Sequence, residues 1–398
     1  MSKLKQSSTK TSLALILPLL AAIIAVSPLA IDMYLPGMPE IAEYFSTKMP
    51  LVQNSLSIYL LGYAVGLLVF GPMADKYSRR RLVIIGLLGF IMTTLALTIA
   101  QNIEQFIFLR FLQAFISSAA TVVVPGIIRQ LYGKDTAKGL SYVSMIMMLA
   151  PMIAPSIGSI LLLDSWQMIF YVLAGYAGIV LVCSYCYLPD VKTVKSSASY
   201  SVIKRYKIVF SNRAARFDLL SIMLISLAFF SYITAIPFVY LTIFEVSEFE
   251  FSWLFGLNVF GLMVAHFINT RLVGRMGSRR MLRCGVVLSV LAGTSLLLAN
   301  IFSLSLIFYV LAILPLMGSL SMISVNADAL ILQEFAEHAG TATAVNGTLR
   351  FGIGALAGPI LAVFYDGSAL PFALLMVVPV YLVLICQLLQ SKQHKVAA

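Results

Sequence analysis

Apolar stretches of membrane-spanning length recur along the whole chain and limit what it can fold into. Sixty per cent of the 398 residues are hydrophobic and 11% are charged, whereas an ordinary soluble domain is about 25% charged. A soluble chain of this size cannot bury so much apolar surface, because much of a folded protein's surface must face water. The sequence therefore predicts an integral membrane protein built from α-helices and argues against a soluble enzyme.

Twelve stretches reach the ~20 apolar residues that a helix needs to cross a bilayer, and they form two sets of six. The first set covers residues 13–35, 51–72, 82–100, 105–127, 139–163 and 168–188. The second set covers residues 217–240, 251–271, 282–300, 303–326, 341–363 and 369–390. A polar, basic segment separates them. The predicted domains are a six-helix half at 1–188, a cytoplasmic linker at 189–216 and a second six-helix half at 217–398.

Basic residues gather in alternate connections between these spans, as they do in the cytoplasmic loops of membrane proteins. They precede the first span, fill the second, fourth, sixth and eighth connections and return in the C-terminal tail, whereas the other connections are mostly acidic. We therefore expect both termini to be cytoplasmic. The net charge of +11 follows from this pattern, and no basic soluble domain indicates nucleic-acid binding. The first span is longer than a signal-peptide core, so we expect it to be retained.

Short sequence matches relate the two sets of spans at a spacing of 200 residues. Residues 78–80, Ser-Arg-Arg, return as residues 278–280, each after the second span of its set. Residues 158–161 correspond to residues 358–361 in the fifth span of each set and share Gly, Ile and Leu. Parallel halves with a site between them near the middle of the membrane are typical of secondary transporters. The sequence therefore indicates an internal duplication and a transporter.

The connection after the second span carries the most specific motif in the chain. It contains Gly71, then Asp75, then the basic pair Arg79 and Arg80. This pattern resembles the loop signature of the major facilitator superfamily. A small residue there lets helices approach closely, and the aspartate can pair with basic groups or cap a helix. In the second half Arg275 replaces the aspartate, so we expect that copy not to form the same charge pairing.

Three further patterns agree with this resemblance. Residues 110–113 in the fourth span resemble the superfamily's Arg-x-x-Gln element. In the fifth span, Pro151, Pro155 and Gly158 resemble the motif associated with antiporters; prolines bend a spanning helix and free carbonyl groups. An ordinary kinked helix is the alternative there. Residues 32–36, Asp-Met-Tyr-Leu-Pro, resemble the signature of the Bcr/CflA branch of drug/proton antiporters.

The resemblance implies an all-α integral membrane protein with a major-facilitator-type 12-helix bundle of two pseudo-symmetric six-helix halves. It also implies efflux of small amphipathic compounds, such as drugs, in exchange for protons by alternating access in the bacterial cell inner membrane. The sequence contains no P-loop for ATP-driven transport and no constellation that indicates an enzyme. The expected partners are a small-molecule substrate, protons and the lipid bilayer. No nucleic acid, cofactor or metal is expected, and the chain is expected to act as a monomer.

Charged residues inside the predicted spans are candidates for function, because an ionisable group in the membrane costs free energy. Asp32 lies toward the outer end of the first span, where burial would let its carboxyl bind a proton. We expect Asp32 to couple proton movement to transport; the alternative is a boundary residue that caps the structure around Pro36. Arg110 in the fourth span is expected to hold Asp32 ionised or to bind an anionic group. Its alternative is a static bond between helices.

Arg350 lies near the middle of the eleventh span, where the Bcr/CflA resemblance gives no reason to expect an arginine. It would favour an anionic substrate, or it would form an internal ion pair with Asp328 or Asp32. Arg350 is therefore a candidate substrate-binding residue, with other residues that could line an amphipathic cavity: Tyr34, Tyr59, Tyr63, Tyr232, Phe238 and Asn346. Aromatic side chains that face lipid are the alternative. Arg350 also leaves open a second function, export of one endogenous anionic metabolite such as a carboxylate siderophore. Import by symport is disfavoured by the fifth-span motif.

Overall fold

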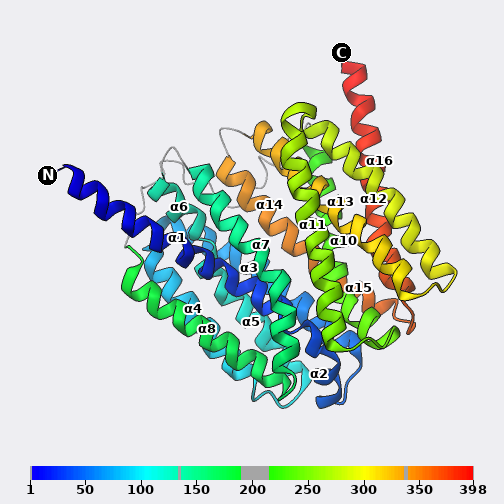
Figure 1. Cartoon of the computed structure of the whole chain (residues 1–398), viewed down its shortest axis with the longest axis horizontal. Coiled ribbons are helices and arrows are strands. Elements are labelled where there is room, and N and C mark those ends of the chain that lie inside the picture. Colours follow the sequence, from blue (N-terminus) through cyan, green and yellow to red (C-terminus); the bar gives the residue numbers. More distant parts are fainter. Residues whose placement is uncertain (1, 133–135, 190–214, 336–338, 398) are drawn as a thin grey trace. The chain divides into compact units, whose positions relative to one another are not determined.

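The computed structural model describes residues 2–132, 136–189, 215–335 and 339–397 of the chain (Figure 1). These residues form helices and turns and contain no β-strand. Among them, ten helices are long and apolar enough to cross a membrane. The remaining two predicted spans, the fifth and the eleventh, are also helical, so the predicted all-helical, 12-span fold is confirmed.

The first six predicted spans are found in chain order. The first consists of α1 (Ser2–Asp32), a short 3₁₀ turn η1 (Leu35–Gly37) and α2 (Met38–Tyr44). The next five consist of α3 (Met49–Lys76), α4 (Arg79–Leu97), α5 (Ile103–Thr121) with α6 (Val124–Tyr132), α7 (Thr136–Leu161) and α8 (Trp166–Tyr187).

The second six follow the same plan. They consist of α10 (Arg216–Pro237) with the π-helix η3 (Phe238–Ile243), α11 (Glu248–Met276), α12 (Ser278–Ile301), α13 (Leu306–Glu334), α14 (Ala339–Gly354) with α15 (Ala357–Val363), and α16 (Leu370–Ala397). Within the part of the chain that the structure describes, four spans are therefore broken or locally rewound. Discontinuous helices of this kind form substrate and ion sites in many transporters.

The chain forms two compact units. The first contains Met1–Gly37 and Val65–Ser199, and the second contains Met38–Ala64 and Tyr200–Ala398. Within the first unit α1 packs against α7 and α8, and α4 packs against α5 and α8. Within the second unit the corresponding helices pack in the same way: α10 against α14 and α16, and α12 against α13 and α16. This shared packing supports the duplication that the sequence indicates.

Local sequence explains several helix ends. Asn102 precedes α5 and accepts a hydrogen bond from the Gln105 N–H at 2.8 Å. Ser247 precedes α11, and Ser247 and Glu250 form a reciprocal capping box. Such caps satisfy backbone N–H groups that have no partner within the helix. They fix where α5 and α11 begin.

The outer surface of the helices is strongly apolar. Trp253 is 80% exposed, Ile99 76% and Val363 78%. Exposed apolar side chains in such number would promote aggregation in water, but they are the expected surface of helices that contact lipid. The exposed apolar side chains therefore agree with a membrane-embedded bundle.

Candidate functional site

Asp32 is the last residue of α1, where the chain turns toward η1. It is buried, with 4% of its surface exposed. Among the described residues, no hydrogen bond or ion pair reaches its carboxylate. A buried carboxylate without a partner is costly while it is charged. Asp32 therefore has the placement expected of a proton-binding group, and that role stays a prediction.

Arg110 lies in α5 and is fully buried. Its Nη1 donates hydrogen bonds to the Ala30 carbonyl oxygen at 3.1 Å and to Gln113 Oε1 at 2.8 Å. Its guanidinium carbon lies 4.5 Å from the centre of the Tyr34 ring. Gln113 Nε2 in turn donates to Thr94 Oγ1 at 2.8 Å. Arg110 therefore ties the end of α1 to α5, and Gln113 extends the network to α4.

The network reaches both sides of Asp32 without binding it directly. Ala30 and Tyr34 lie two residues before and two residues after Asp32. Within the described residues, no hydrogen bond or ion pair joins Arg110 to Asp32. Arg110 thus acts on the backbone and the aromatic ring that flank Asp32, and the predicted partnership of the two charges remains untested.

The basic pair of the loop signature connects α4 to other helices of the first unit. Arg79 Nη1 donates a hydrogen bond to Gln130 Oε1 at 2.6 Å. A Cβ atom at Gly126 would lie 2.8 Å from Arg79 Cζ, so the Arg79 guanidinium in its present position packs directly against the α6 backbone at Gly126. Arg80 donates to the carbonyl oxygen of Tyr185 and lies 5.4 Å from the centre of its ring. These two arginines join α4 to α6 and α8.

Gly71 and Asp75 are the other two residues of the loop signature. No described atom lies within 4 Å of the position that a Cβ of Gly71 would take, so the described part of the chain contains no close helix approach at Gly71. The side chain of Asp75 lies outside the described part of the structure. Its predicted charge pairing therefore remains a prediction.

The fifth-span motif lies in α7, which contains both Pro151 and Pro155. Pro155 is buried and Pro151 is half-buried. A Cβ atom at Gly158 would overlap the carbonyl oxygen of Met33. Glycine therefore allows α7 to contact the backbone immediately after Asp32. α7 and the break that follows α1 therefore lie in close contact at Gly158.

A polar cluster in the second unit surrounds Arg350. Arg350 Nη2 donates to Asp328 Oδ2 at 2.8 Å and to Ser324 Oγ at 3.0 Å. Asn346 Nδ2 donates to the other carboxylate oxygen of Asp328. The sequence allowed Asp328 or Asp32 as the ion-pair partner of Arg350, and in the structure the pair forms with Asp328. The side chains of Arg350 and Asp328 are 32% and 33% exposed.

This cluster lines a cavity of about 340 Å³. Asp328, Asn346 and Arg350 supply its charged and amide groups, and Leu332 and Phe351 are among its apolar lining residues. The cavity therefore lies between α13 and α14 and combines polar and apolar walls, as small-molecule sites do.

The aromatic candidates are all buried, and whether they line a substrate cavity stays a prediction. The ring centre of Tyr63 lies 4.6 Å from that of Phe351, at the edge of the cavity lining. Tyr34 belongs to the Arg110 network. The others lie elsewhere: Tyr59 is buried in α3, the Tyr232 hydroxyl accepts a hydrogen bond from Asn258 at 2.9 Å, and Phe238 packs against Tyr365 with ring centres 5.5 Å apart.

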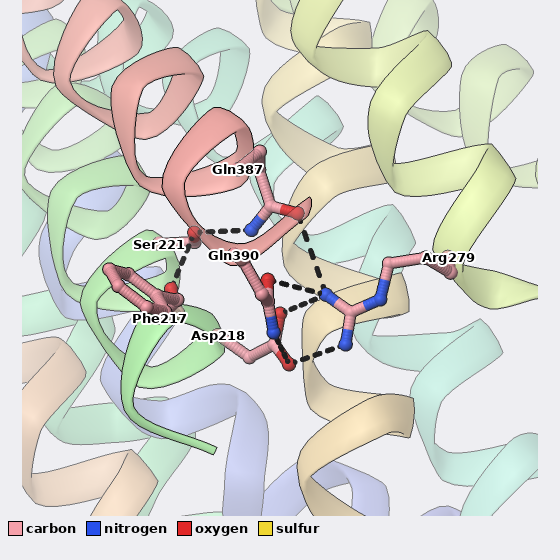
Figure 2. A network of polar contacts seen from close by, with 6 residues as sticks. All are labelled: Phe217, Asp218, Ser221, Arg279, Gln387 and Gln390. Atoms are coloured by element: carbon pink, nitrogen blue, oxygen red, sulfur yellow. Dashed lines mark hydrogen bonds and ion pairs between the residues drawn. The ribbon is translucent and has the colours of Figure 1, made fainter. Parts of the chain in front are cut away.

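Sequence reasoning missed a second ion pair, in which the aspartate is buried and the arginine is partly exposed. Asp218, at the start of α10, binds Arg279 of α12 through both carboxylate oxygens, at 2.6 and 2.8 Å (Figure 2). Gln387 and Gln390 of α16 accept further hydrogen bonds from Arg279 at 3.5 and 2.8 Å. Arg279 belongs to the repeated Ser-Arg-Arg motif, but its partner lies 61 residues away and carries no motif. The second copy of the motif thus forms a charge pair of another kind, with an aspartate that lies outside the motif.

Comparisons with known proteins identify the family. The chain matches the sequence profile of the Major Facilitator Superfamily over residues 20–359. It is 32% identical to the uncharacterized MFS-type transporter YdgK of Bacillus subtilis over 377 residues, which cover 93% of this chain and 92% of that protein. It is 29% identical to the bicyclomycin resistance protein homolog of Haemophilus influenzae over 349 residues, which cover 86% and 88%.

Two further similarities are consistent with this assignment. The chain is 28% identical to the multidrug transporter MdfA of Shigella boydii over 280 residues, which cover 69% of this chain and 67% of that protein. Its fold resembles the crystal structure of the nucleoside transporter NupG, with a TM-score of 0.73 at 12% identity over 94% of this chain and 99% of that chain. At this identity the structural likeness concerns the fold alone. The chain belongs to the Major Facilitator Superfamily and is a multi-pass membrane transporter.

Proposed function

We propose that this protein is a secondary active transporter that exports small amphipathic compounds in exchange for protons. The observation that carries the proposal is Asp32, a buried carboxyl without a partner among the described residues, at the helix break after α1. The relatives named for bicyclomycin resistance and multidrug transport support drug efflux as the activity.

Asp32 serves as the proton acceptor in this proposal. A carboxyl in a low-dielectric site exchanges its proton when substrate or water changes its surroundings. Arg110 holds Ala30 and Tyr34 on either side of it, so a movement of α5 changes the environment of Asp32. Gly158 brings α7 to the same backbone segment. Helix movement and proton binding are thereby linked.

The two predicted halves, joined by residues 189–216, would rock around a shared site in alternating access. Both termini and the linker lie in the cytoplasm of a bacterium in this proposal, because basic residues concentrate in those connections. The protein would sit in the inner membrane and act as a monomer. Ion gradients drive the transport in such an arrangement, and no cofactor is needed.

The cavity between α13 and α14 contributes to substrate binding in this proposal. Its apolar walls suit the apolar part of an amphipathic compound, and Arg350 with Asn346 supplies polar contacts. The ion pair with Asp328 neutralises Arg350, which removes the argument for a purely anionic metabolite. The relatives' names give no support to a siderophore either.

Growth of a pump-deficient bacterium across a panel of drugs tests the proposal. The strains carry wild type, Asp32→Asn, Asp164→Asn or empty vector, with membrane levels of the three proteins matched. Asp164 is an exposed carboxylate between α7 and α8 and provides the control. We expect resistance with wild type and Asp164→Asn and loss of resistance with Asp32→Asn. Resistance to none of the drugs in spite of full expression would contradict drug efflux.

A further inference from the structure

The cavity of the second unit contains both partners of an ion pair. Asp328 comes from α13 and Arg350 from α14, and each side chain is about one-third exposed. Ile331, Leu332 and Phe351 add apolar surface. The cavity thus presents one negative group, one positive group and an apolar wall to a single small ligand.

α14 presents a receptor for a carboxylate. Asn346 and Arg350 are four residues apart and therefore lie on one face of the helix. Asn346 donates to one carboxylate oxygen of Asp328 and Arg350 donates to the other at 2.8 Å. An amide and a guanidinium that grip the two oxygens of one carboxylate form a charge-assisted, geometrically specific site. In this structure the side chain of Asp328 occupies it.

The guanidinium has capacity beyond this internal contact. Nη2 of Arg350 makes both of its hydrogen bonds, to Asp328 and to Ser324. Within the described residues, Nε and Nη1 of Arg350 make none. A guanidinium has five N–H donors in a planar fork. Arg350 can therefore bind a ligand oxyanion through its remaining N–H groups before its hydrogen bond to Asp328 breaks.

The charge of a ligand determines how much free energy it costs to separate Asp328 from Arg350 when the ligand binds. A monoanion that displaces Asp328 leaves this carboxylate without its partner, and a monocation that displaces Arg350 leaves the guanidinium unpaired. Removing one partner of a charge pair is costly, because the remaining charge is uncompensated. A zwitterion avoids both costs, since its carboxylate binds Arg350 and Asn346 while its ammonium group binds Asp328.

We propose that this cavity binds small zwitterions that carry a carboxylate, an ammonium group and an apolar side chain. The ligand exchanges the internal Asp328–Arg350 pair for two pairs of its own and places its apolar part on Leu332 and Phe351. A volume of about 340 Å³ lies at the lower end of ligand sites, which fits a molecule of amino-acid size. The inference rests on the proposed function, because it takes the ligand of this cavity to be a compound that the transporter carries.

Three probes with the same phenyl ring isolate the effect of charge: phenylalanine, phenylethylamine and 3-phenylpropionate. Their binding to the purified full-length protein is measured by isothermal titration calorimetry. We expect wild type to bind phenylalanine about tenfold more tightly than either of the others, a difference of about 1.4 kcal/mol. Asp328→Asn should then favour 3-phenylpropionate, and Arg350→Gln should favour phenylethylamine. Equal weakening of all three probes by both variants, or no preference in wild type, would overturn the proposal.

A double variant guards against misfolding of the single ones. Asp328→Asn with Arg350→Gln leaves no unpaired charge, so it should fold and bind the three probes with similar affinity. A preference for phenylalanine that persists in the double variant contradicts the proposal. Binding is independent of the drug-resistance assay, so the two ideas can fail separately: resistance without zwitterion binding removes this inference, and zwitterion binding without resistance removes drug efflux.

Discussion

Single side chains in the first unit carry most of the proposed chemistry. Asp32 is buried at the end of α1, and Arg110 contacts the backbone and the ring that flank it. The contacts of Arg110 with the Ala30 carbonyl and the Tyr34 ring could not be derived from the sequence, because both residues lie far from Arg110 along the chain; Ala30 is 80 positions away. The sequence did single out both charges, since ionisable residues inside a span are rare. Arg350 is a similar case: the sequence allowed Asp328 or Asp32 as its ion-pair partner, and the structure shows the pair with Asp328.

Arg110→Lys separates the shape of this side chain from its charge. A lysine ammonium cannot bond Ala30 and Gln113 and also stack on Tyr34 in the way that the planar guanidinium does. We expect efflux to fall by at least about tenfold and the protein to lose roughly 1–3 kcal/mol of stability, the usual cost of leaving a buried polar group without its hydrogen-bond partner. Dye efflux from cells and thermal unfolding of the purified protein measure the two effects.

Arg280→Lys is the matched control, because Arg280 is exposed at the start of α12. This substitution should leave both efflux and stability close to wild type. If Arg110→Lys also behaves like wild type in both measurements, Arg110 does not position the region around Asp32.

Helices followed from the sequence more reliably than their interruptions. Hydropathy and length located a helix at each predicted span, because a bilayer imposes a minimum length on any helix that crosses it. Some bounds were wrong: α1 begins at Ser2, α13 ends at Glu334 and α16 ends at Ala397, each well outside the predicted range.

The break between α5 and α6 falls at Val122 and Val123, directly before Pro125. Pro125 has no N–H to donate to the Thr121 carbonyl and its ring crowds that carbonyl, so a local signal for this break is present in the sequence. The break between α14 and α15 precedes Gly358, whose N–H donates to Ser57 at 2.7 Å, a partner 301 residues away that no local pattern predicts.

The ion pair between α10 and α12 makes a prediction about these helices. Arg279→Gln leaves Asp218, which is 3% exposed, without its positive partner. Breaking a buried pair in this way costs about 3–5 kcal/mol, and less where one partner is partly exposed, as Arg279 is at 30%. We therefore expect a loss of roughly 2–3 kcal/mol, measured as a lower temperature of thermal unfolding.

Two companion variants make this test specific. Asp218→Asn combined with Arg279→Gln removes both charges and should restore part of the lost stability. Arg275→Gln, at an exposed position near the end of α11, should have little effect. An unchanged unfolding temperature for Arg279→Gln would mean that the pair does not hold α10, α12 and α16 together.

At the scale of the whole molecule, the duplication organises both units. Equivalent helices pack in equivalent pairs, as α1 does with α7 and α10 with α14. The chemistry has nevertheless diverged between the units. The first contains a buried carboxyl without a partner among the described residues, and the second contains charges that are paired: Asp218 with Arg279 and Asp328 with Arg350. We infer a division of labour in which Asp32 exchanges protons and the second unit contributes contacts to the substrate.

Transport by the purified protein in proteoliposomes with an imposed proton gradient tests proton-coupled export most directly. A fluorescent amphipathic cation such as ethidium is supplied outside vesicles whose interior is acidic. We predict that wild type and Asp164→Asn concentrate the dye inside, that a protonophore abolishes this, and that Asp32→Asn fails to concentrate the dye but still exchanges it across the membrane without a gradient. Accumulation by Asp32→Asn at the wild-type rate, or transport by wild type that ignores the gradient, would contradict the account.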